Sequence, residues 1–155
     1  MKDTIKTDNI NVERYIISDL GMIPNSELEE YIRKTDKLML DDPLNSELFD
    51  YLDSLYKFWI ERDSNNENAY HMYLDMLNLT NHYYEAYDIC IDLLKEDKFK
   101  YMVYKELTDF GYVCDGVISF DEHIDFIREA IGLCENTEEK EELEDLLTYR
   151  ENLWK

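Results

Sequence analysis

Apolar residues recur every three or four positions along almost the whole chain, and this period constrains the fold more than any other feature. One such stretch runs through Leu48, Leu52, Leu55 and Trp59. Residues at these spacings share one face of a helix. The 155 residues include only four glycines and two prolines, so few positions interrupt regular structure. The pattern therefore predicts an all-α protein.

Helix ends are indicated by proline and by capping residues. Asp41-Asp42-Pro43 ends one helix, because the residue before a proline is displaced from the helical conformation. Asn45 or Ser46, and Asn66 or Asn68, suit the position that caps the next helix. A chain of this length fits a single helical-repeat domain over residues 1–155. We expect eight helices, near residues 9–21, 26–40, 45–62, 66–79, 82–96, 99–112, 119–134 and 137–153.

The predicted helices repeat along the chain. Those containing Phe49, Tyr83 and Phe120 follow one another at intervals of 34 and 37 residues. A period in the thirties with two helices per unit is typical of an α-solenoid, in which each helical hairpin buries its apolar face against the next. The expected fold is a right-handed α-solenoid or a compact bundle of about eight helices in antiparallel hairpins. An irregular helical bundle is the alternative.

The segment from Asn68 to Asp97 resembles a tetratricopeptide repeat. Tyr70 stands where that family has its first aromatic residue, and Tyr73 where it has a leucine. His82-Tyr83-Tyr84-Glu85-Ala86 resembles the turn and the small residue that open the second helix of the repeat. Leu93-Leu94-Lys95-Glu96-Asp97 resembles its closing segment.

The chain also departs from the tetratricopeptide pattern. The family's packing glycine, late alanine and final proline are replaced by Leu74, Leu93 and Lys98. Weaker copies flank the segment, with Leu52 and His123 at the place of Ala86, so the resemblance extends over residues 45–134. It implies peptide or protein binding on a concave face, and it implies no chemistry.

The charge of the chain restricts its partners. It contains 37 Asp and Glu against 16 Lys and Arg, a formal charge of −21 at pH 7. Binding to nucleic acid requires clustered basic residues that neutralise phosphates, and an acidic protein also repels anionic membranes. We therefore expect a protein partner with a basic surface and no direct nucleic-acid binding. The alternative is that the charge serves solubility alone.

The sequence also predicts a cytoplasmic location without membrane contact. The longest stretch free of Asp, Glu, Lys and Arg is nine residues, Met76–Tyr84, well short of the ~20 apolar residues of a spanning helix. The segment Met1–Lys6 is polar and lacks the apolar core of a signal peptide. Three widely spaced cysteines suit free thiols in a reducing compartment, and they are Cys90, Cys114 and Cys134.

No motif in the sequence predicts catalysis, a cofactor or a metal site. His71, His82 and His123 belong to no zinc-binding spacing, and no cysteine has a neighbouring histidine. The four glycines form no phosphate-binding loop. The acidic run from Glu135 to Glu151 carries an apolar stripe, so we expect a terminal helix with a polar outer face.

The residues most suited to binding lie between Asp63 and Leu94, which contain no Lys or Arg. Tyrosine is enriched where interfaces carry their energy, and carboxylates between phenols suit a partner rich in Arg or Lys. The predicted partner-binding residues are Tyr70, Tyr73, Asp75, Tyr84, Glu85 and Asp88. We expect Tyr83 in the core, Tyr84 and Asp88 facing solvent, and at least one of Tyr70 and Tyr73 partly exposed. The alternative is that several of these tyrosines simply pack between helices.

Two functions fit these features. The first is a non-catalytic inhibitor or neutraliser that masks a basic, nucleic-acid-handling target. It would be an immunity protein or a phage anti-defence protein, with mimicry of duplex DNA as one mechanism. The second is a tetratricopeptide-like chaperone or adaptor that cradles an extended peptide.

Overall fold

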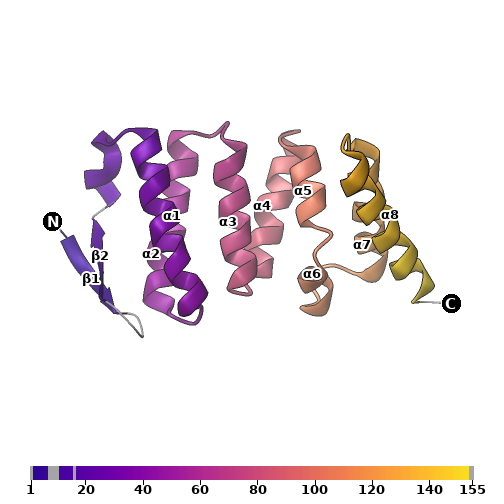
Figure 1. Cartoon of the computed structure of the whole chain (residues 1–155), viewed down its shortest axis with the longest axis horizontal. Helices are drawn as coiled ribbons and strands as arrows, with labels where there is room; N and C mark the ends of the chain where they lie inside the picture. The colour runs from indigo at the N-terminus through magenta and orange to yellow at the C-terminus, as the bar shows by residue number, and fades with distance from the viewer. Residues whose placement is uncertain (1, 7–10, 16, 154–155) are drawn as a thin grey trace. The chain divides into compact units, whose positions relative to one another are not determined.

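The computed structural model describes residues 2–6, 11–15 and 17–153. Contacts divide the chain into two compact units, Met1–Thr80 and Asn81–Lys155, and each is described by itself. The first unit comprises β1 (Lys2–Lys6), β2 (Asn11–Tyr15), the 3-10 helix η1 (Ile17–Met22), α1 (Asn25–Asp41), α2 (Ser46–Arg62) and α3 (Glu67–Leu79). The second comprises α4 (Tyr83–Lys95), α5 (Lys100–Glu106), α6 (Phe110–Cys114), α7 (Phe120–Leu133) and α8 (Thr137–Asn152) (Figure 1).

The prediction of an all-α fold is confirmed, since the described part of the chain forms eight α-helices beside one short hairpin. Two of the predicted caps are in place. The side chains of Asn45 and Asn66 accept hydrogen bonds from backbone N–H groups three residues on, at 3.0 and 3.2 Å. Each asparagine amide also donates to the aspartate three residues before it, Asp42 or Asp63. The turns that lead into α2 and α3 are therefore built in the same way.

The predicted helix at 9–21 is wrong for the residues that the structure describes there. β2 pairs with β1 in an antiparallel hairpin, with Ile5 opposite Val12, and η1 follows. Residues 9, 10 and 16 of the predicted helix lie outside the described residues. Isoleucine and valine favour extended backbone. The strand at 11–15 forms because it pairs with a second segment, and the spacing of apolar residues within one segment does not indicate such a partner.

The predicted helix at 99–112 is also wrong, because the chain forms α5 and α6 there in place of one helix. Asp109 interrupts the helix and caps α6 by accepting a hydrogen bond from the backbone N–H of Gly111 at 2.7 Å. Gly111 permits a close approach to α4, since a Cβ at this position would collide with the ring of Tyr83. Aspartate at the N-cap was the local signal for this second helix.

In the first unit, α1 packs on α2 and α3, and α2 packs on α3. Tyr56 is fully buried, with its ring stacked on those of Tyr73 at 5.2 Å and Trp59 at 6.4 Å between centroids. The hydroxyl of Tyr56 donates to Asp36 and that of Tyr73 donates to Asp53. These phenols are tolerated in the interior because each one finds an acceptor.

In the second unit, α4 packs on α5 and α6, α5 packs on α7, and α7 packs on α8. A capping box starts α7: the Ser119 hydroxyl accepts from the Glu122 N–H, and the Glu122 carboxylate accepts from the Ser119 N–H. Apolar residues at helical spacing form the core of this unit, and they include Ala86, Cys90, Leu93, Val103, Leu107, Tyr112, Ile127, Ala130 and Leu143.

Candidate functional site

Three of the predicted partner-binding residues lie on the exposed side of α4. Tyr84 is 65% exposed, and Glu85 and Asp88 are exposed as well. Asp88 follows Tyr84 by one turn, so its carboxylate and the phenol share a face of the helix. Within the described part of the chain, no Lys or Arg forms an ion pair with Glu85 or Asp88. We refer to Tyr84, Glu85 and Asp88 as the α4 surface.

The neighbouring Tyr83 faces another direction. It was predicted to lie in the core, but it is only half-buried. Its ring meets Tyr112 edge-on, with 5.3 Å between centroids, and it lies against Gly111. Loss of hydration raises the pKa of the Tyr83 phenol, and the nearby Asp109 and Asp115 add to that rise. Tyr83 therefore holds α4 and α6 together, while Tyr84 is left to solvent.

The other three predicted residues lie on α3 in the first unit. Asp75 is exposed, 3.4 Å from the imidazole of His71, and Tyr70 is half-buried. Tyr73 is only 3% exposed, so its assignment as a partner-binding residue is wrong. The physical reason is that its hydroxyl bonds to Asp53 on α2 and its ring stacks on Tyr56, which together hold it in the core.

The first unit also contains a groove between α1 and α3 that was not predicted from the sequence. Its volume is ≈ 480 Å³. Leu40 and Leu79 line it while remaining 65% and 42% exposed, and Met76 is buried. We call it the α1–α3 groove, and its lining residues are Arg33, Asp36, Lys37 and Leu40 from α1 and Met72, Asp75, Met76 and Leu79 from α3.

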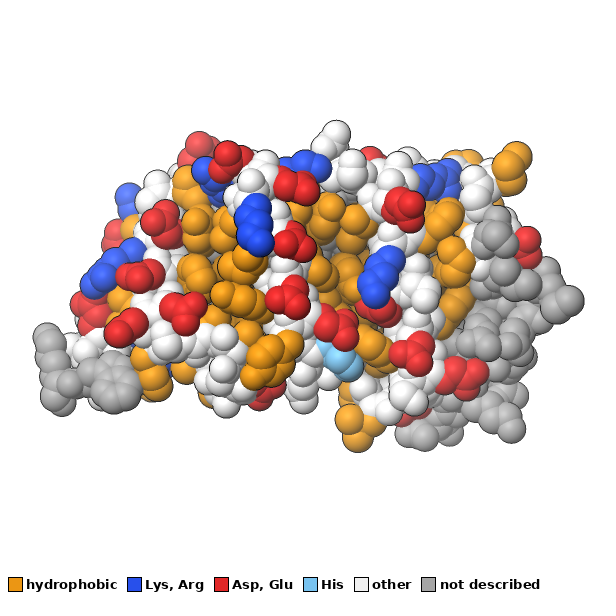
Figure 2. All heavy atoms as spheres, turned by 180° about the vertical axis from the view of Figure 1, so that it is seen from behind, with side chains coloured by type: hydrophobic (Ala, Val, Ile, Leu, Met, Phe, Trp, Pro, Cys, Tyr) orange, Lys and Arg blue, Asp and Glu red, His pale blue; other side chains and the backbone are white. Residues whose placement is uncertain are grey.

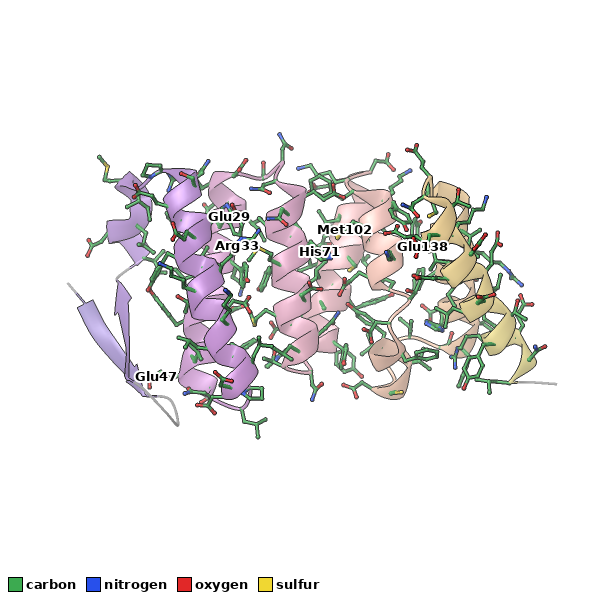
Figure 3. All side chains as sticks on the ribbon, viewed as in Figure 1. Glu29, Arg33, Glu47, His71, Met102 and Glu138 are labelled. Atoms are coloured by element: carbon green, nitrogen blue, oxygen red, sulfur yellow. The ribbon has the colours of Figure 1, made fainter. Side chains whose placement is uncertain are left out.

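The two walls of the α1–α3 groove are built from equivalent positions 39 residues apart. The side chain of Asn68 donates to that of Glu29 at 2.8 Å across this same interval, which shows that α1 and α3 lie in matching register. Glu29 and Arg33 follow one another on α1 (Figure 3). The groove residues pair as Asp36 with Asp75, Leu40 with Leu79, Arg33 with Met72, and Lys37 with Met76. Two matching pairs at this interval were the sequence signal for the groove.

A half-buried carboxylate lies in the middle of the groove. Burial raises the pKa of Asp36, the hydrogen bond from Tyr56 opposes that rise, and the negative charge of Asp75 adds to it. Arg33, on the same wall, pairs with Glu29 at 3.2 Å. The groove thus combines one carboxylate from each of the two facing helices with two cations from α1, Arg33 and Lys37.

The second unit buries a histidine and an arginine together. Nε2 of His123 lies 2.7 Å from the carbonyl oxygen of Thr108, and Nδ1 accepts from Nε of Arg150 at 3.0 Å. The guanidinium lies between Phe110 and Phe120, with its central carbon 5.0 and 4.1 Å from the ring centroids. Burial lowers the pKa of His123, and the adjacent cation lowers it further. The imidazole is fully buried, and this pair joins α7 to α8.

The outer face of α8 is polar, as predicted. Glu138, Glu141, Glu142 and Asp145 are exposed and fall at spacings of three and four, while Leu143 is buried. Like charges at these spacings repel one another. Within the part of the chain that the structure describes, no Lys or Arg forms an ion pair with these four carboxylates, so this face carries a concentration of negative charge.

Apolar side chains are also uncovered. On the face of the molecule shown in Figure 2, they lie between acidic and basic groups. The acidic surplus therefore forms no continuous carboxylate surface there. Among the described residues, no helix has the length and apolar character needed to cross a bilayer. Comparison of the chain with models of protein families, with curated proteins and with solved structures gave no match.

Proposed function

We propose that the protein is a non-catalytic binding module that inhibits or neutralises a protein with a basic surface. The observation that carries this proposal is the exposed ring of Tyr84 beside the exposed carboxylates of Glu85 and Asp88, which form no ion pair with a Lys or Arg among the described residues. Tyrosine is among the residues that dominate binding energy at interfaces. A lysine or arginine over such a ring contributes about 0.5–1 kcal/mol at an exposed site, and neighbouring carboxylates speed encounter.

The charge distribution favours a target that handles nucleic acid. Residues 81–155 contain 20 Asp and Glu against 8 Lys and Arg, and the outer face of α8 carries several of these carboxylates exposed to solvent. Surfaces that bind phosphates are rich in Lys and Arg, so they are complementary to this unit. Two settings fit such a blocker: an immunity protein that guards a cell against a toxin, and a phage protein that blocks a host defence nuclease.

A capture experiment tests the proposal. The immobilised protein is exposed to lysate of its native host at low and at high salt, and bound proteins are identified by mass spectrometry. We expect a basic, nucleic-acid-handling protein that is lost at high salt, since exposed charges are screened over about 8–10 Å at 0.1–0.15 M ionic strength. Replacing Tyr84→Ala and Asp88→Lys together should abolish its capture while the melting temperature stays within about 2 °C, because both side chains are exposed.

A charge-matched variant controls for the change in net charge. Asp50→Lys alters an exposed carboxylate on α2, in the other unit, by the same amount and should leave capture intact. If the Tyr84 and Asp88 variant captures the same protein as well as wild type does, the α4 surface is not the binding site. If wild type captures nothing, or only acidic proteins, the proposed function is wrong.

A second candidate function is a tetratricopeptide-like adaptor that cradles a peptide. The α1–α3 groove favours it, because a narrow groove between neighbouring helices, lined by apolar and charged side chains, suits a single segment of chain better than a folded surface. In that case the captured protein should still bind after its tertiary structure is removed, whereas the target of an inhibitor should not.

A further inference from the structure

α8 is held to α7 by few buried side chains. The two helices lie side by side (Figure 1), and Leu143 and Arg150 are the buried residues among the sixteen of α8. Near the start of α8, the Glu139 carboxylate also accepts a hydrogen bond from the Tyr101 hydroxyl of α5 at 2.7 Å. Near its end, the guanidinium of Arg150 reaches His123 on α7. The pair of His123 with Arg150 is therefore the buried attachment of the last turns of α8.

The partners of His123 determine which of its ring nitrogens carries a proton. A carbonyl oxygen only accepts, so Nε2, which lies 2.7 Å from the carbonyl oxygen of Thr108, carries the proton of the ring. A guanidinium only donates, so Nδ1, which lies 3.0 Å from Nε of Arg150, is unprotonated and accepts. Only the neutral imidazole satisfies both partners, because a protonated ring has no acceptor left for Arg150.

Protonation of His123 would place two cations in contact inside the second unit. The side chains of His123 and Arg150 are 0% and 3% exposed. Among the described residues, no carboxylate forms an ion pair with Arg150, and its Nη2 is buried without a hydrogen-bond partner. The guanidinium lies instead over the rings of Phe110 and Phe120. A protonated His123 would therefore lose one hydrogen bond and face an adjacent positive charge, and detachment of α8 would relieve both penalties.

The other charged groups around His123 only partly oppose this effect. Burial lowers its pKa most, Arg150 adds to that decrease, and the Thr108 carbonyl and the Asp109 carboxylate before α6 act in the opposite direction. Cys114 and Tyr149 act on Arg150 instead. Within the described part of the chain, the groups that shift the pKa of His123 do not include the other charged side chains of α5, α7 and α8, such as Lys105, Glu106, Glu122, Arg128 and Glu151.

We propose that His123 and Arg150 form a pH-sensitive latch: below about pH 6.5, protonation of His123 releases α8 from α7, while the rest of the second unit stays folded. Release carries the acidic outer face of α8 away from α7 and uncovers the sides of the Phe110 and Phe120 rings that face Arg150. The latch is independent of the proposed function, because it requires no partner and no residue of the α4 surface.

The expected size of the response follows from the uptake of one proton. When α8 is released, the pKa of His123 returns to the ordinary value of histidine, about 6.5, whereas in the attached state it is lower. Attachment is therefore fully stabilised above about pH 6.5 and loses stability as the pH falls below it, by at most about tenfold per pH unit. Between pH 7 and pH 5, the equilibrium constant for release should rise by about 10- to 25-fold.

Backbone hydrogen exchange of the full chain, followed by mass spectrometry at pH 7, 6 and 5, measures the release. Each exchange rate is divided by the intrinsic rate at the same pH, so the ratio gives the opening equilibrium of that segment. We expect the protection of residues 143–152 to fall by about 10- to 25-fold from pH 7 to pH 5. At pH 5, α4 should remain at least tenfold better protected, because release of one helix requires less free energy than unfolding of the whole unit.

Two variants assign the response to His123. His123→Gln removes the ionisable group, while the glutamine amide can still bond to either partner of the imidazole, so the change in protection of residues 143–152 should drop below threefold. The matched control His71→Gln alters an exposed histidine of the first unit and should keep the wild-type response. Circular dichroism at pH 7 shows whether each variant folds. If His123→Gln does not fold, NMR titration of the wild-type histidine rings replaces it, and His123 should titrate at a lower pH than His71.

Several results would overturn the latch: a change in protection below threefold for residues 143–152 of the wild type, equal protection of α4 and α8 at pH 5, or a full wild-type response in His123→Gln. A His123 ring that titrates at or above the pH of the His71 ring would also overturn it. None of these measurements uses a partner protein. Failure of the latch therefore leaves the proposed function standing, and failure of the capture experiment leaves the latch standing.

Discussion

Replacing Tyr56→Phe removes a single hydroxyl from the core of the first unit and should destabilise the protein measurably. The ring can keep its stacking on Tyr73 and Trp59, so the change isolates the hydrogen bond to Asp36. A hydrogen bond to a charged group contributes about 1.5–3 kcal/mol. Because Asp36 is half-buried and water can partly replace the phenol, we expect a loss of about 1.5–2 kcal/mol at pH 7.

The same substitution should show a defined pH dependence. The bond from Tyr56 favours the ionised carboxylate and so lowers the pKa of Asp36, against the larger effect of burial. In Tyr56→Phe that pKa rises further. The destabilisation is therefore larger at neutral pH than at acidic pH. It shrinks as the pH falls through the raised pKa of Asp36, since a protonated carboxyl is a weaker acceptor.

Urea denaturation, which gives the free energy of unfolding, and thermal denaturation at pH 7 and near pH 3.5 provide the measurements. At roughly 2–4 °C per kcal/mol for a chain of this size, the melting temperature at pH 7 should fall by about 3–8 °C. Tyr51→Phe is the matched control, because its hydroxyl lies 2.5 Å from the neutral hydroxyl of Tyr31. The control should lose less, with no change between the two pH values. A loss below about 0.5 kcal/mol for Tyr56→Phe, or an equal loss at both pH values, would refute the reasoning.

Two further predictions concern the second unit. Gly111→Ala should destabilise the protein by about 1–3 kcal/mol in thermal denaturation, because the new methyl collides with Tyr83, and the loss should shrink in a Tyr83→Ala background. Stability should also fall as the pH drops below about 6.5. In the unfolded chain His123 takes up a proton near that pH, whereas in the folded protein burial and the adjacent Arg150 lower the pKa of His123 and so oppose its protonation. A His123→Gln variant that loses stability between pH 7 and pH 5 as steeply as wild type would contradict this second prediction.

Local features predicted most of the helices and the α4 surface. Apolar spacing and the asparagine caps lie within a few residues of each helix start, so the bounds of α2 and α3 agree closely with the prediction. The shared face of Tyr84 and Asp88 follows from the helical period alone. By contrast, the burial of Tyr73 depends on an acceptor 20 residues away on another helix, which no local pattern indicates.

The missed features share the same physical origin. The strand Asn11–Tyr15 exists only because it pairs with Lys2–Lys6. The α1–α3 groove requires knowledge of which helices lie side by side, and the interval of 39 residues between its walls differs from the intervals of 34 and 37 found between the other helices. The break before α6 has a different origin from the other missed features. Asp109 is a local N-cap signal for it, but the apolar residues on both sides keep a helical spacing, which predicted one continuous helix.

The matching register of α1 and α3 also gives the groove a direction. Asp36 with Asp75 and Leu40 with Leu79 are identical pairs, so each wall carries the same residue types at these two positions. The remaining two pairs break this equivalence, because the α1 wall presents two cationic side chains where the α3 wall presents two thioethers. A segment that is turned end for end, or rolled toward the other wall, would exchange cationic neighbours for apolar ones. The repeated positions can thus contribute to affinity in either orientation of a bound segment. The positions that differ between the two walls would select one orientation.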